Sequence, residues 1–106
     1  EKALRLVEEN MENPEFSVNN LCDDLGMSRS QLYRKFESIT GLTPNDFIRS
    51  VRLKRAAQLL RGSSYNISEI SDRVGFNSIK YFNKYFKEEF GFTPTQYRSN
   101  GSGETK

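Results

Sequence analysis

Apolar residues recur along the chain three or four positions apart, which is the spacing of amphipathic helices. The first clear run begins after Ser17, a residue that can cap a helix, and stops at Gly26. Its apolar members are Val18, Leu21, Cys22 and Leu25. A longer run follows Ser28, which begins a capping box with Gln31, and stops at Gly41. Its apolar stripe is Leu32, Phe36 and Ile39. The pattern predicts a short helix, a tight turn and a longer helix.

This arrangement occurs twice. The spacing Phe36-x4-Gly41-x-Thr43-Pro44 returns 50 residues later as Phe86-x4-Gly91-x-Thr93-Pro94. Upstream, Val18, Leu21, Leu25 and Gly26 match Ile67, Ile70, Val74 and Gly75. A duplication explains the match, and each copy follows the helix-turn-helix plan, in which two helices cross closely. Small residues suit such a crossing, and Cys22 and Ser71 stand four positions before the respective glycines. We therefore interpret Cys22 as a packing residue.

A long helix is predicted between the copies, because Thr43 can cap it and Pro44 suits its first position. It extends to about Arg61 and has two apolar sides. One side carries Phe47, Ile48, Val51 and Leu59, and the other carries Leu53, Ala56, Ala57 and Leu60. Apolar spacing also predicts an opening helix near Val7 and a short closing helix around Tyr97.

The predicted fold is all-α, with about seven helices in two helix-turn-helix lobes joined by a long linker helix. Residues 1–42 form the first lobe, 43–62 the linker helix and 63–98 the second lobe. Residues 99–106 are rich in Gly and Ser and are expected to form a disordered tail.

Composition argues against several kinds of chemistry. The 106 residues contain one cysteine and no histidine, so an internal disulfide, a multi-cysteine zinc site and a nucleophile paired with histidine are all excluded. The carboxylates are scattered among lysines and arginines. We therefore expect no metal, no cofactor and no enzymatic activity. No apolar stretch is long enough to span a membrane.

Charge is unevenly distributed, although the net charge is only +2. Residues 1–26 contain two basic and seven acidic residues, whereas residues 27–106 contain fourteen basic and seven acidic ones. Such charges can simply solvate helix surfaces. Here, however, the positive part contains both predicted second helices, which favours an anionic partner such as nucleic acid.

A recognition helix inserts its first turns into the DNA major groove, so the residues there that point away from the core are the candidates for reading bases. In the first lobe these are Ser30, Tyr33 and Arg34, and in the second they are Ile79, Lys80, Asn83 and Lys84. The neighbouring Arg29, Lys35 and Lys87 are expected to bind phosphates. Tyr81 and Tyr85 are interpreted as packing at the edge of the core, because duplex DNA offers no unstacked base to a rigid helix.

The sequence resembles the AraC/XylS transcription activators over about residues 2–98. The resemblance is carried by four stretches, in which Ser71 stands where the family more often has alanine. These stretches are Ile67-Ser68-Glu69-Ile70-Ser71-x-x-Val74-Gly75-Phe76, Tyr81-Phe82-x-x-Tyr85-Phe86-Lys87, Gly91-Phe92-Thr93-Pro94-x-x-Tyr97-Arg98 and the linker Arg52-Leu53-x-x-Ala56-x-x-Leu59-Leu60.

The resemblance implies the C-terminal DNA-binding domain of a cytoplasmic transcription regulator, with activation as its expected effect. The linker stretch resembles in particular the output domain of a hybrid two-component regulator. The implied partners are double-stranded DNA and RNA polymerase, with no membrane contact by this domain. Any dimerisation, and any membrane anchor of the full-length protein, would belong to a missing N-terminal part.

Two other classes of function fit the sequence less well. A protein-docking module should expose large apolar or aromatic residues on these helices, whereas the predicted outward faces carry Arg34, Lys80, Asn83 and Lys84. An enzyme would need catalytic groups such as a nucleophile paired with histidine, and this sequence has no histidine.

Overall fold

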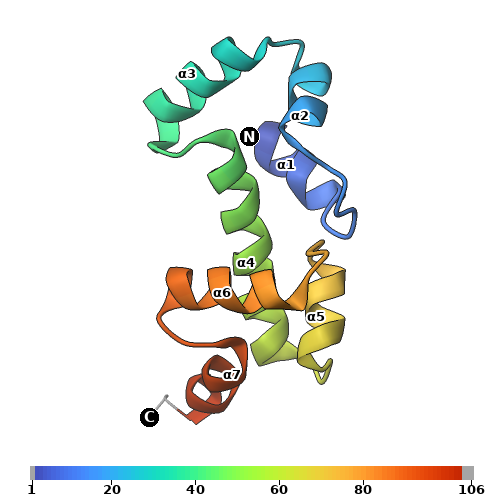
Figure 1. Ribbon diagram of the computed structural model, residues 1–106, viewed down its shortest axis with the longest axis vertical. Coiled ribbons are helices and arrows are strands. Elements are labelled where there is room, and N and C mark those ends of the chain that lie inside the picture. The colour runs from blue at the N-terminus through green and yellow to red at the C-terminus, as the bar shows by residue number, and fades with distance from the viewer. Residues whose placement is uncertain (1, 104–106) are drawn as a thin grey trace.

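The computed structural model describes residues 2–103, and the seven regular elements of that range are all α-helices. They are α1 (Lys2–Glu9), α2 (Val18–Leu25), α3 (Arg29–Thr40), α4 (Pro44–Gly62), α5 (Ile67–Arg73), α6 (Ile79–Phe90) and α7 (Pro94–Gly103). Figure 1 shows α1, α2 and α3 at one end of the molecule and α5, α6 and α7 at the other, with α4 running between them. The predicted fold of two helix-turn-helix lobes on a linker helix is confirmed.

Local hydrogen bonds fix where the helices begin. The Ser28 hydroxyl accepts from the Gln31 amide at 3.2 Å, while the Gln31 side chain accepts from the Ser28 amide at 2.9 Å. Asn66 and Glu69 form the same reciprocal pair at the start of α5, with both bonds at 2.8 Å. These capping boxes satisfy amides that a helix leaves without an internal partner, so the starts are encoded in four-residue segments.

Each lobe has its own apolar core, and α4 contributes to both. The first core consists of Val7, Phe16, Val18, Leu21, Cys22, Leu32, Phe36 and Ile48. The second consists of Leu53, Ala56, Ala57, Leu60, Ile70, Val74, Phe82 and Phe86. Leu59 was expected on the first side of α4 but packs against the second core, because the C-terminal half of α4 lies entirely within the second lobe.

A buried arginine connects the two lobes. Arg52 in the middle of α4 is only 5% exposed. Its Nη1 donates to the Met11 carbonyl at 2.8 Å and to the Val74 carbonyl at 2.7 Å, and its Nη2 donates to the Asn13 carbonyl at 2.9 Å. Burial lowers the pKa of the guanidinium from its ordinary value, but arginine stays protonated in proteins. One charged group therefore joins the loop after α1 to the end of α5.

Gly75 makes room for this contact. Its φ is +85°, and a Cβ at this position would lie 1.4 Å from Arg52 Nη1 and 2.5 Å from the Met11 carbonyl oxygen. Gly26 occupies the equivalent turn of the first lobe with φ +69°, but a Cβ there would meet nothing within 4 Å. Both turns therefore need glycine for their left-handed backbone, and the turn at Gly75 also needs it for the space that Arg52 occupies.

The end of the chain differs from the expectation. Residues 99–103 were expected to be disordered, but they continue α7 to Gly103. Once Thr93 and Pro94 have started a helix, each further residue adds a hydrogen bond at a small cost, so even Gly and Ser can prolong it. Residues 104–106 of the expected tail lie outside the described residues.

Ile39 also differs from the expectation, since it is 64% exposed. It follows the buried Leu32 and Phe36 at helical spacing. However, the C-terminal end of α3 projects beyond α1 and α2 in Figure 1, so these helices leave its last turn uncovered.

We predict that Gly75→Ala destabilises the protein more than Gly26→Ala does. Both variants force alanine into a left-handed conformation, which costs about 1–2 kcal/mol. Gly75→Ala also displaces Arg52 from buried carbonyls, adding about 1–3 kcal/mol. Urea denaturation followed by circular dichroism measures both, and equal losses would contradict this role of Arg52.

Phe86→Ala should lower the free energy of unfolding by about 3–5 kcal/mol, because Phe86 is fully buried in the second core. Phe92→Ala removes the same side chain from a site that is 43% exposed, and should cost less than about 1 kcal/mol. Thermal melting of both variants checks the assignment of the core, which would be wrong if Phe86→Ala melted like Phe92→Ala.

Candidate nucleic-acid interface

The exposed face of α3 is fixed by what the helix buries. Leu32 and Phe36 are buried in the first core, so Ser30 and Arg34 are exposed, as are Arg29 and Lys35. Helical spacing thus predicted the exposure of these four side chains correctly.

Tyr33 is a partial exception, because its side chain is only half-exposed and packs against the first core. The guanidinium carbon of Arg29 lies 5.7 Å from the centre of the Tyr33 ring, and Arg29 Nη1 donates to the Asn19 side chain in α2 at 2.8 Å. Arg29 is therefore held where α2 and α3 meet. Part of the Tyr33 ring therefore contacts Arg29.

The second recognition helix, α6, has a clear division between its two sides. Phe82 and Phe86 are fully buried. The predicted DNA-facing residues are all exposed, namely Ile79, Lys80, Asn83, Lys84 and Lys87. The Ser78 hydroxyl accepts from the Tyr81 amide at 3.4 Å and caps the helix. These five exposed side chains are three lysines, an amide and one apolar group.

The two tyrosines of α6 behave differently from each other. Tyr85 packs against the second core, in agreement with the interpretation as edge packing. Tyr81 is 57% exposed, with its ring centre 6.5 Å from that of Tyr85. Tyr81 was expected to pack at the edge of the core, but its place three residues before Lys84 puts these two side chains close together on the helix. Tyr81 therefore joins the candidate interface.

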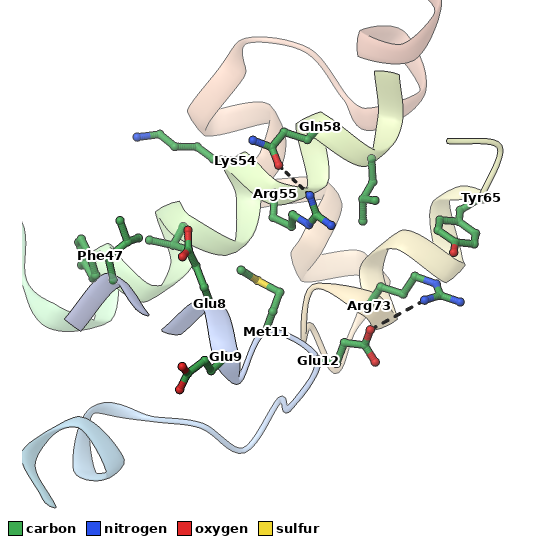
Figure 2. A pocket seen from close by; sticks show the side chains of 13 residues that line it. Glu8, Glu9, Met11, Glu12, Phe47, Lys54, Arg55, Gln58, Tyr65 and Arg73 are labelled. Atoms are coloured by element: carbon green, nitrogen blue, oxygen red, sulfur yellow. Dashed lines mark hydrogen bonds and ion pairs between the residues drawn. The ribbon is translucent and has the colours of Figure 1, made fainter. Parts of the chain in front are cut away.

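A groove between α1, α4 and α5 lies away from these faces, and Figure 2 shows its lining. Glu8, Glu9 and Glu12 come from or follow α1, and Arg55 of α4 and Arg73 of α5 lie across from them. Glu12 forms an ion pair with Arg73 at 3.8 Å. Three carboxylates balance three basic side chains in this groove, so it offers a phosphate backbone no net attraction, and none of the ten predicted DNA-contacting residues lines it. This side of α4 is a poor surface for DNA.

Residues 2–103 contain neither a candidate metal cluster nor a membrane-spanning helix. No group of three or more His, Cys, Asp or Glu side chains there is placed to hold a metal ion. None of the helices in this part of the chain is long and apolar enough to cross a bilayer.

Comparison with known proteins gives consistent matches. A family model described as a helix-turn-helix domain matches residues 21–100. Histidine kinase P4 of Formosa agariphila is 50% identical over 101 residues, which cover 95% of this chain and 7% of the kinase. The HTH-type transcriptional activator RhaR of Escherichia coli K12 is 35% identical over 98 residues, covering 92% of this chain and 34% of the activator. The chain therefore spans only a small part of these relatives.

Among solved structures, the DNA-binding domain of the global transcriptional factor AdpA, in complex with a target DNA, superposes with a TM-score of 0.88. It is 27% identical in sequence, and the match covers 99% of this chain and 95% of that domain. The arrangement of two lobes on a linker helix is thus that of a domain solved on DNA.

Proposed function

Because this chain belongs to the AraC/XylS family of DNA-binding transcription regulators, we propose that it binds a specific double-stranded DNA sequence through two tandem helix-turn-helix units. The observation that carries the proposal is the exposed polar face on both recognition helices. Arg34 and Ser30 stand out from α3, and Lys80, Asn83 and Lys84 stand out from α6. The first turns of both helices can therefore enter a major groove.

The chemistry of these side chains suits base recognition. Arg34 can donate two hydrogen bonds to O6 and N7 of guanine, and Asn83 can pair with N6 and N7 of adenine. Ile79 offers an apolar contact for a thymine methyl group. Ser30, Tyr33, Lys80 and Lys84 would complete the contacts in the two major-groove segments. Arg29, Lys35 and Lys87 would bind phosphates, which position the domain without reading sequence.

The target is expected to be asymmetric. The two recognition helices present different side chains, so they cannot both prefer one sequence. Arg52 and α4 hold the lobes in one relation, which supports binding to two major-groove segments about one helical turn apart on one DNA face.

We further propose that the domain activates transcription in the cytoplasm and serves as the output domain of a two-component regulator. The relationship to an activator, RhaR, and to a histidine kinase supports these two points. RNA polymerase is the proposed partner in activation. Dimerisation would use regions outside this chain. The domain acts as a binding module rather than an enzyme, which the family supports.

The isolated domain should bind duplex DNA with a strong dependence on salt. If six to eight basic groups contact phosphates, log K should fall against log salt with a slope of roughly −5 to −7. Titration of random duplex DNA at several salt concentrations measures this slope. A flat response, or no binding, would favour a protein-docking module instead.

Single substitutions should separate base reading from phosphate binding. Arg34→Ala should relax the preference in one half of a selected site, at about 1–3 kcal/mol, and Asn83→Ala should do so in the other half. Lys87→Ala should weaken binding to all DNA sequences by the same factor. Affinities for single-base variants of a site selected from a random library check this. A uniform loss with Arg34→Ala would instead make Arg34 a phosphate contact.

A further inference from the structure

A second groove lies between the two lobes, and we call it the interlobe groove. Its lining includes Ser17 at the start of α2, Asn45 and Arg49 of α4, and Ser78, Tyr81 and Lys84 at or near the start of α6. At about 100° per residue, Asn45 and Arg49 lie on the side of α4 away from Lys54 and Gln58, which line the groove of Figure 2. In contrast to that groove, none of the described residues that line this one carries a carboxylate.

Two cations from different helices meet in the interlobe groove around one ring. The guanidinium carbon of Arg49 lies 4.3 Å from the centre of the Tyr85 ring, and the Lys84 Nζ lies 5.4 Å from the same centre. Arg49 Nη2 also donates to the Asp46 carboxylate at 2.7 Å, and the Arg49 side chain is 36% exposed. Stacking on Tyr85 and the bond to Asp46 therefore hold Arg49 in one orientation at the groove.

The groove is continuous with the candidate recognition surface of α6. Lys84 and Tyr81 belong both to the exposed side of α6 and to the wall of the groove. If α6 enters the major groove of DNA, one DNA strand borders that major groove on the side of the first lobe. This DNA strand must pass the wall of the interlobe groove. The 19 residues of α4 span about 28 Å, and adjacent major-groove segments on one face of DNA lie about 34 Å apart. The backbone between these segments therefore faces the middle of the protein.

We propose that the interlobe groove binds the DNA sugar–phosphate backbone between the two major-groove segments, with Arg49 as a direct phosphate contact. The proposal rests on the proposed function. Arginine is well suited to the role, because its planar fork matches phosphate oxygens. It carries five N–H donors, of which the bond to Asp46 uses one. The hydroxyls of Ser17 and Ser78 and the amide of Asn45 add polar groups along the same groove.

The first experiment compares Arg49→Gln with Arg55→Gln. Both remove one positive charge from α4, but Arg55 lines the groove of Figure 2 and pairs with Gln58. Arg49→Gln should weaken binding to the selected site and to random DNA by about 3- to 10-fold, and should reduce the magnitude of the salt slope by about 1. Arg55→Gln should change affinity less than about twofold at physiological salt, where charges are screened within about 8 Å. Unchanged thermal melting of both variants establishes that folding is not the cause.

The second experiment locates the phosphate. Single methylphosphonate groups, which carry no charge, replace the phosphates between the two segments of the selected site one at a time. At the phosphate that Arg49 contacts, the methylphosphonate should weaken DNA binding by the parent protein. It should not weaken DNA binding by Arg49→Gln any further. At every other phosphate, the fold-losses of affinity caused by the methylphosphonate and by Arg49→Gln should multiply.

Two results would overturn the proposal: equal affinities of Arg49→Gln and Arg55→Gln, or multiplying losses at every phosphate tested. Both are read on a parent protein that binds DNA, so they leave the proposed function standing. Absence of salt-dependent DNA binding by the parent would instead defeat the proposed function itself.

Discussion

The arrangement of the two lobes depends on the burial of one charge. The Arg52 guanidinium is removed from water, which is costly unless its donors find partners. Three backbone carbonyls supply them, from Met11 and Asn13 on one side and Val74 on the other. Loss of any of these contacts would leave a buried charge or a buried carbonyl poorly satisfied. The lobes are therefore fixed to the linker and to each other, and Gly75 is the residue whose missing side chain permits it.

This constraint divides the surface of α4 between two uses. On one side, the groove of Figure 2 holds three glutamates and three basic residues, so its charges balance and phosphate gains no net attraction there. On the other side, Arg49 and Lys84 meet at the Tyr85 ring in the interlobe groove, beside the exposed side of α6. Because Arg52 sets the position of the second lobe, it also sets the relation between α3, α6 and this groove. A domain with a flexible linker could not present one continuous surface to DNA.

Much of the candidate site followed from helical spacing, because burial of Leu32 and Phe36, or of Phe82 and Phe86, forces the opposite residues outward. The failures occurred where neighbouring elements decide the outcome. Tyr33 is half-buried because it packs against the first core and beside Arg29, whose side chain is hydrogen-bonded to α2. Tyr81 is exposed where a residue beside two buried phenylalanines was expected to pack. Ile39 continues an apolar stripe, but it borders an open pocket between α3 and the start of α1 and stays exposed.

The sequence by itself determined the helices, their starts and the duplication, since capping boxes and apolar periodicity act within a few residues of one another. It also determined that the chain lacks the histidine and cysteine partners of most catalytic and metal sites. Only the tertiary structure decided the surroundings of Arg52 and Arg49. The partners of Arg52 are carbonyl oxygens 22 to 41 residues away, and every residue has a carbonyl, so no side-chain pattern marks them. Arg49 gains its position from Tyr85, which reaches it only after the second lobe has packed onto the linker.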